Sequence, residues 1–189
     1  MLSDDERRQL LALADGSILE GLASGHPLRV DLASLLPVPA APGAAFVTLR
    51  RDDRLRGCIG TLDPYRPLAE DCAANAYAAA FRDPRFPPLD GAEYPLLHLH
   101  ISVLGPTRPL SVSTEAELHD RLRPGEDGLV LEEGTRRATF LPNVWEQVPD
   151  PRTFVRQLKR KAGLPDDYWS TSMRFGRYSI EEVCSGPPP

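Results

Sequence analysis

One short segment places a thiol and a guanidinium two residues apart. It is LRGCIGT, residues 55–61. Side chains alternate along a strand, so Arg56 and Cys58 are expected on one face, with Leu55 and Ile59 directed toward the core on the other. A guanidinium beside a thiol favours the thiolate, which is the nucleophilic form of cysteine. The spacing therefore suggests a reactive thiol at Cys58.

The same segment also has a purely structural explanation, and the sequence leaves both open. Gly57 and Gly60 would let a ligand reach the backbone, but they would equally let another part of the protein approach it. In the structural case Cys58 is a small hydrophobic residue in a tight sheet, and Arg56 extends its charge to water.

Two histidines share one face of a later strand. His98 and His100 are two residues apart in LLHLHISVLGP, residues 96–106. Together they supply two metal ligands, and no third ligand is evident nearby, so we expect no tightly bound transition metal. His100 is instead a candidate general base for Cys58, provided that its strand pairs close to residues 55–60.

The composition is that of an ordinary globular domain. The 189 residues are 41% hydrophobic and 26% charged, with a net charge of -5, which disfavours nucleic-acid binding. No apolar run is long enough to cross a bilayer, and the first residues do not resemble a signal peptide, so a cytoplasmic protein is expected. The cysteines Cys58, Cys72 and Cys184 lack CxxC spacing and are expected to be reduced thiols.

Hydrophobic periodicity and turn residues predict the elements that position these side chains. Helices are expected at residues 4–23, 68–81 and 153–163, with a short helical turn at 143–147. Strands are expected at 44–50, 55–62, 96–106, 128–133, 136–141 and 172–180, with two hairpins among them. Because strands do not alternate regularly with helices, we expect an α+β fold with antiparallel sheets and peripheral helices.

The proline-rich loop RDPRFPPL, residues 82–89, is expected to be a fixed wall. Its prolines restrict their own backbone and that of the preceding residues. We take Phe86 as its one large apolar side chain and expect it to point inward beside the strand that holds Cys58. Arg82 or Arg85 is then expected at the edge of the binding region.

Five segments in order resemble a known family. LRGCIGT, RDPRFPPL, ISVLGP, FLPNVWEQ and KRKAGL, spread between about residues 5 and 180, resemble the AMMECR-type domain family, more narrowly its bacterial branch in AmmeMemoRadiSam systems. The resemblance implies one two-lobed domain over residues 1–189. The larger lobe would contain both termini, the smaller lobe would be inserted from the middle of the chain, and a cleft would lie between them.

The resemblance also implies a role for LRGCIG, residues 55–60, as the lining of that cleft. The expected binding residues are Leu55, Arg56, Gly57, Ile59, Gly60 and Arg85. The cleft would bind a substrate or partner in a pathway shared with a Memo-like protein and a radical-SAM protein. The alternative is a thiol-dependent enzyme with Cys58 as nucleophile. The sequence names no cofactor.

Overall fold

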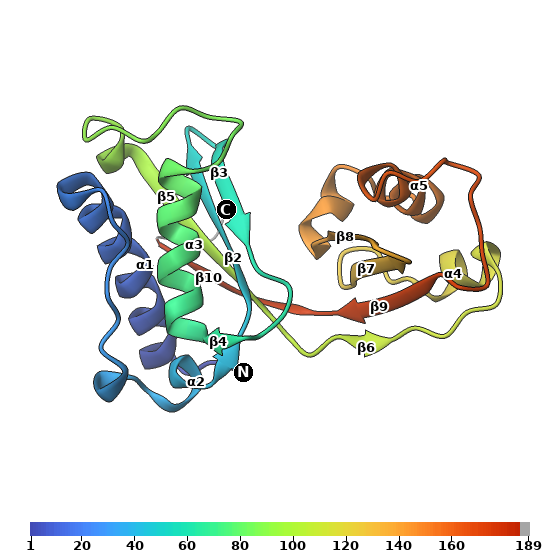
Figure 1. Cartoon of the computed structure of the whole chain (residues 1–189), viewed down its shortest axis with the longest axis horizontal. Coiled ribbons are helices and arrows are strands. Elements are labelled where there is room, and N and C mark those ends of the chain that lie inside the picture. Colours follow the sequence, from blue (N-terminus) through green and yellow to red (C-terminus); the bar gives the residue numbers. More distant parts are fainter. Residues whose placement is uncertain (186–189) are drawn as a thin grey trace. The chain divides into compact units, whose positions relative to one another are not determined.

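The computed structural model describes residues 1–185, which divide into two compact units (Figure 1). Unit 1 comprises Met1–Leu104 and the segment that begins at Glu181, and unit 2 is Gly105–Ile180. Each unit has its own buried hydrophobic cluster. Within the described residues, no helix combines the length and the apolar character needed to cross a membrane.

Unit 1 is a four-stranded antiparallel sheet with two long helices packed on one face (Figure 1). The strand order is β10 (Ile180–Cys184), β5 (Leu97–Leu104), β2 (Ala45–Arg51) and β3 (Arg54–Gly60). The helices are α1 (Asp4–Ser24) and α3 (Leu68–Phe81). Val47, Leu49 and Ile101 point toward them and are fully buried. We call the other face of this sheet the open face.

Local signals explain the two long helices. Ser3 and Glu6 form the predicted capping box at the start of α1, and Gly25 ends the helix at a φ of 77°. The α3 helix has the predicted bounds, and its alanines allow close packing on β2 and β3. Its Asp71 is fully buried and accepts the Ala45 N–H at 2.9 Å, which ties α3 to the sheet.

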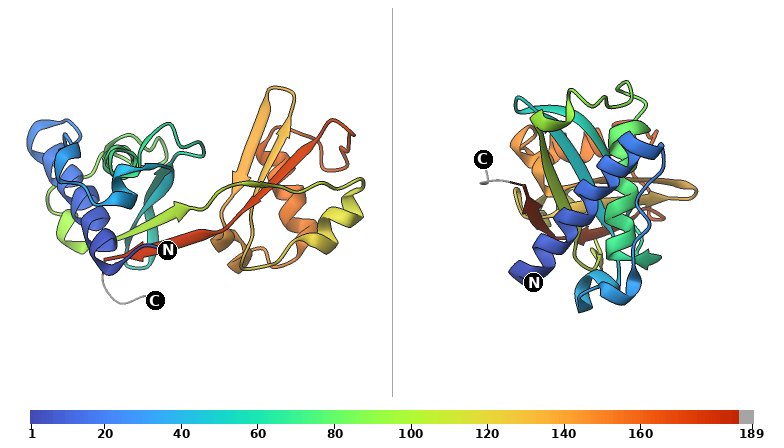
Figure 2. Two further views of the ribbon diagram at one scale, coloured as in Figure 1. Left: turned by 90° about the horizontal axis from the view of Figure 1, so that it is seen from below. Right: turned by 90° about the vertical axis from the view of Figure 1, so that its left-hand side faces the viewer.

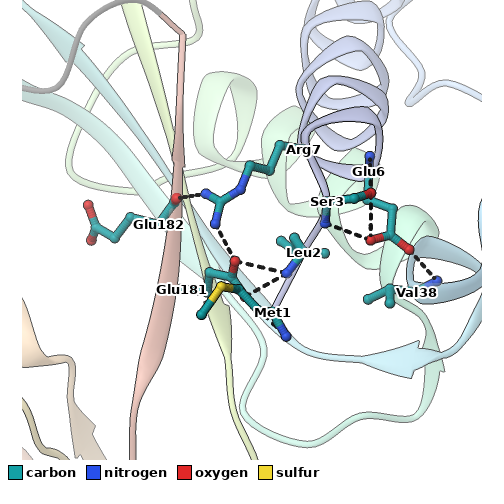
Figure 3. Close-up of polar contacts among 8 residues, drawn as sticks. All are labelled: Met1, Leu2, Ser3, Glu6, Arg7, Val38, Glu181 and Glu182. Atoms are coloured by element: carbon teal, nitrogen blue, oxygen red, sulfur yellow. Dashed lines mark hydrogen bonds and ion pairs between the residues drawn. The ribbon is translucent and has the colours of Figure 1, made fainter.

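Short elements complete unit 1. They are η1 (Leu32–Ser34), α2 (Pro37–Ala40), η2 (Tyr94–Leu96) and the paired strands β1 (Pro42–Gly43) and β4 (Arg66–Pro67). The N-terminal segment of unit 1 lies beside β10, as Figure 3 shows. The Leu2 N–H donates to Glu181 at 2.9 Å, and Arg7 donates to the Glu182 carbonyl at 2.7 Å.

Unit 2 is a second antiparallel sheet with its own helices. The strand order is β6 (Arg108–Pro109), β9 (Arg174–Tyr178), β7 (Gly128–Glu133) and β8 (Arg136–Phe140), and β9, drawn in red, runs antiparallel to the β6 segment (Figure 2). The helices are α4 (Glu115–Arg121), η3 (Pro142–Glu146) and α5 (Pro151–Lys161). In the core, the rings of Trp145 and Phe154 stack with centroids 3.7 Å apart.

The expected α+β class with antiparallel sheets is confirmed, but one predicted strand is wrong. The sequence pattern predicts a single last strand over residues 172–180. The chain instead forms β9 in the sheet of unit 2 and then β10 in the sheet of unit 1. Ser179 separates them, and its carbonyl accepts the Gly105 N–H at 2.9 Å. Sheet membership depends on long-range pairing, which local periodicity does not report.

Candidate functional site

A β-bulge decides which side chains of residues 55–60 reach the open face. Gly57 and Leu55 pair with consecutive residues of β2, which leaves Arg56 as an extra residue in β3. On the N-terminal side of the bulge, the alternation of side chains between the two faces of the sheet is therefore reversed. Leu55 lies on the open face with 43% of its surface exposed, whereas Arg56 is only 8% exposed. The expectations that Leu55 faces the core and that Arg56 shares a face with Cys58 are therefore wrong.

Arg56 is engaged by the segment that follows α3. Its Nε and Nη2 donate to the two carboxylate oxygens of Glu93 at 2.9 and 2.8 Å, and Nη2 also donates to the Pro87 carbonyl at 3.0 Å. Hydrogen bonding to Arg56 lowers the pKa of Glu93 to about 2. Within residues 1–185, the buried Nη1 of Arg56 has no hydrogen-bond partner. The hydrogen bonds that Arg56 makes therefore hold the segment after α3 in place.

Cys58 sits on the edge strand with its backbone bonded by the same loop. Its N–H donates to Asp83 Oδ2 at 2.9 Å, and its carbonyl accepts from Arg85 Nη2 at 3.1 Å. Asp83 and Arg85 also form an ion pair, which holds the pKa of Asp83 well below its usual range. These two side chains satisfy edge-strand groups that would otherwise be open to pairing with another chain.

The loop lies beside β3 as predicted, but Phe86 is not its buried apolar anchor. Leu89 is 5% exposed, and its N–H donates to the Ala80 carbonyl at 2.9 Å. Phe86 is half-buried, with the guanidinium carbons of Arg56 and Arg85 at 5.8 and 5.6 Å from its ring centroid. Leu89 also belongs to the loop, so the expectation that Phe86 is its one large apolar group is wrong.

The glycines of residues 55–60 meet parts of the protein itself. A Cβ on Gly57 would lie 2.1 Å from the carbonyl oxygen of Ala79 in α3, and one on Gly60 would lie 2.2 Å from the ring of Phe46. Ile59 packs against the core of unit 1. The tight packing explains why these positions are glycine, and their role in ligand binding stays a prediction.

Four side chains form a row across the open face. Thr48 pairs with Cys58 on one side and with His100 on the other, and its hydroxyl donates to the Cys58 Sγ at 3.3 Å. Cys184 ends the row on β10, with its Sγ 3.1 Å from His100 Nδ1. The row therefore crosses all four strands in the order Cys184, His100, Thr48, Cys58.

This register does not give Cys58 a direct base. His100 and Cys58 are separated by two strand spacings, about 9–10 Å, and the imidazole contacts Cys184 instead. Burial lowers the pKa of His100, with a further contribution from Arg50, which favours the neutral imidazole. Sequence reasoning could not place Cys184 beside His100, because 84 residues separate them along the chain.

The other two thiols are held in the protonated form. Cys72 is fully buried in α3, and burial raises the pKa of its thiol far above its usual range. Burial also raises the pKa of the Cys184 thiol, with a further contribution from Glu182. Thr48, Asp83 and Glu93 were not selected from the sequence, although all three contact the segment that holds Cys58.

These features define a class of α+β protein in which an edge strand bearing a cysteine is fixed by an Asp–Arg loop and an Arg–Glu ion pair. The AMMECR1 family model matches residues 11–183, and the chain belongs to this family. A protein of Methanothermobacter thermautotrophicus is 37% identical over 182 residues, covering 95% of this chain and 94% of that protein. One of Thermofilum pendens is 42% identical over 179 residues, covering 89% and 84%.

A solved structure has the same fold. The crystal structure of an uncharacterized protein from Pyrococcus horikoshii matches with a TM-score of 0.88 and 31% sequence identity. The match covers 96% of this chain and 92% of that one. The similarity extends over both units and establishes the fold of the chain.

Proposed function

We propose that the open face of unit 1 is the binding surface of this AMMECR1-family protein, and that Cys58 and Leu55 contact the bound substrate or partner. The observation that carries the proposal is the row from Cys184 to Cys58. Both long helices of unit 1 pack on one face of the sheet, and the other face carries two thiols, an imidazole and a hydroxyl.

The surroundings of Cys58 support a binding role. Leu55 is a large apolar side chain with 43% of its surface exposed, and half-exposed Arg85 lies within hydrogen-bond distance of the Cys58 carbonyl. An apolar contact beside a few polar groups is the usual composition of a specific binding site. The loop of residues 82–89 fixes this part of β3, so little order has to be gained on binding.

The first partners to test are those implied by the resemblance, a Memo-like protein and a radical-SAM protein. We propose that this chain acts with them in one pathway, through the open face. A binding surface that serves a partner needs no catalytic base beside Cys58, which agrees with the distance between Cys58 and His100.

Titration calorimetry with the two candidate partners from the same organism tests the proposal. Leu55→Asp places a charge on the open face and is expected to weaken binding at least tenfold. Leu32→Asp is the matched control, because Leu32 is a similarly exposed leucine (53%) on η1. The proposal is wrong if neither candidate binds the unmodified chain, or if both variants bind as it does.

A thiol-dependent enzyme with Cys58 as nucleophile is the second candidate. The observation in its favour is the Thr48 hydroxyl, which donates to the Cys58 Sγ and would stabilise a thiolate there. Alkylation of the folded chain by iodoacetamide, followed for each cysteine by mass spectrometry, tests it. Cys58 is expected to react first and at least tenfold faster than free glutathione at neutral pH. Reaction only after unfolding would exclude this role.

A further inference from the structure

Three side chains that bind metals converge at the β10 end of the row. His100 comes from β5, whereas Glu182 and Cys184 lie two residues apart on β10 and therefore share a face. One ligand atom from each lies within 4.8 Å of the other two, and the Sγ···Nδ1 distance is 3.1 Å.

We propose that His100, Glu182 and Cys184 bind a zinc ion. Zinc takes nitrogen, sulfur and oxygen ligands at about 2.0–2.3 Å in tetrahedral geometry, which separates neighbouring ligand atoms by about 3–4 Å. The Sγ···Nδ1 separation of 3.1 Å lies in this range, and the ligand atom of Glu182 lies within 4.8 Å of those of the other two residues, so side-chain rotation would complete the site. Three protein ligands leave a fourth position for water or a bound group, the arrangement typical of catalytic zinc.

The charges of the three groups suit a divalent cation. A thiolate and a carboxylate together contribute two negative charges, which balance Zn²⁺. The His100 imidazole adds a neutral nitrogen ligand of the kind that zinc commonly takes. Zinc binding must displace the proton of the Cys184 thiol, because the thiolate is the form that coordinates a metal.

The backbone that carries these ligands is fixed by contacts outside the site. Ser185 exchanges two hydrogen bonds with Leu99, both of 2.9 Å, which sets the register of β10 against β5. The Ser102 hydroxyl lies 3.4 Å from Glu182 Oε1 and can orient that carboxylate. Arg7 binds the Glu182 carbonyl, so α1 holds β10 as well (Figure 3).

A simple thiol–imidazole hydrogen bond explains the contact of Cys184 with His100, but it gives no reason for the carboxylate that joins them. The sequence predicts no tightly bound transition metal, because His98 and His100 supply only two ligands. The proposed zinc site departs from that prediction. Pairing of β10 with β5 supplies the missing ligands. The site lies on the open face, yet it does not depend on the proposed partner binding.

Zinc titration of the full chain, after removal of metal with a chelator, tests the proposal. We expect one Zn²⁺ per chain with micromolar or tighter affinity, and release of a proton on binding. Substitution with Co²⁺ is expected to give a thiolate-to-cobalt charge-transfer band and the intense visible bands of tetrahedral cobalt. These spectra are measured on the unmodified chain and so do not depend on how well any variant folds.

Variants then identify the ligands. Cys184→Ser and His100→Ala are each expected to weaken zinc binding at least 100-fold, and Glu182→Gln at least tenfold. His98→Ala is the matched control on the same face and should bind zinc as the unmodified chain does. The proposal fails if the unmodified chain binds no zinc, if cobalt gives no thiolate band, or if Cys184→Ser retains full affinity.

Discussion

At the scale of single residues, the ion pair of Arg56 with Glu93 matters most for residues 55–60. Arg56 is almost fully buried and donates to both carboxylate oxygens. Removing one partner of a buried pair leaves the other charge without compensation, which costs more than the pair itself contributes. Glu93 therefore holds Arg56, and Arg56 in turn holds the loop that bonds the Cys58 backbone.

We predict that Glu93→Gln lowers the free energy of unfolding by about 2–3 kcal/mol at pH 7. The pKa of Glu93 is about 2 in the folded chain, against an ordinary 4.5. Its contribution is therefore fully present above about pH 5 and is lost as the pH falls toward 2. Urea unfolding of the unmodified chain should show this loss, and the variant should show a flatter dependence on pH.

Glu146→Gln is the control for this measurement, because Glu146 is an exposed glutamate on η3. It should leave both the stability and its pH dependence unchanged. Equal stability of the Glu93 variant and the unmodified chain at pH 7 would show that the buried ion pair is not required. Asp83, whose pKa is also depressed, will leave some pH dependence in the Glu93 variant.

At the level of helices and strands, the sequence was sufficient to predict those elements whose signals are local. The capping box of Ser3 and Glu6, the alanine-rich helix and the hairpin of β2 with β3 all depend on residues close in the chain. The bulge at Arg56 could not be predicted in this way. It adds one residue to β3 without changing the apolar pattern, and it reverses which side chains face the core.

The same limit applies to the site. Cys58 was identified from its neighbours in the sequence, and it does lie in the row on the open face. The neighbours of His100 were missed because Glu182 and Cys184 reach it only through pairing of β10 with β5. Contacts across 82–84 residues depend on register, and no local spacing encodes that register.

The packing of β3 on α3 gives a prediction at this scale. A Cβ at residue 57 would lie 2.1 Å from a backbone carbonyl oxygen, which cannot move aside as a flexible side chain would. Gly57→Ala is therefore expected to destabilise the chain by about 1–3 kcal/mol or more. Gly91→Ala is the matched control, because nothing lies within 4 Å of its added Cβ.

Urea unfolding of the two alanine variants makes the comparison. The Gly91 variant should unfold at the midpoint of the unmodified chain or slightly above it, since alanine reduces the conformational entropy of the unfolded chain. If the two variants unfold at the same midpoint, close packing of α3 does not explain the glycine at 57. A role in ligand approach would then become the better explanation.

On the largest scale, residues 1–185 contain two separate hydrophobic cores. Unit 2 begins after Leu104 and ends at Ile180, so the chain passes between the units twice. The buried clusters of the two units have no residue in common. A core substitution is therefore expected to act mainly on the unit that contains it, because cooperative unfolding follows packed contacts.

Two leucine substitutions and two spectroscopic signals test whether the two cores unfold independently. Leu49 in β2 and Leu158 in α5 are both fully buried, and replacing either with alanine is expected to cost about 2–5 kcal/mol. Both tryptophans, Trp145 and Trp169, lie in unit 2, so their fluorescence reports on that unit. The far-ultraviolet helix signal comes mostly from unit 1, where α1 and α3 have 21 and 14 residues.

In urea, Leu158→Ala should lower the midpoint of the fluorescence transition. Most of the helix signal should still be lost at the midpoint of the unmodified chain. Leu49→Ala should lower the midpoint of most of the helix signal and leave the fluorescence midpoint unchanged. The helix signal will retain a minor component from α4 and α5, which have 7 and 11 residues. If each substitution lowers both midpoints equally, the two cores unfold as one cooperative system. The open face would then be coupled energetically to unit 2, and a partner bound there would stabilise the whole chain rather than unit 1 alone.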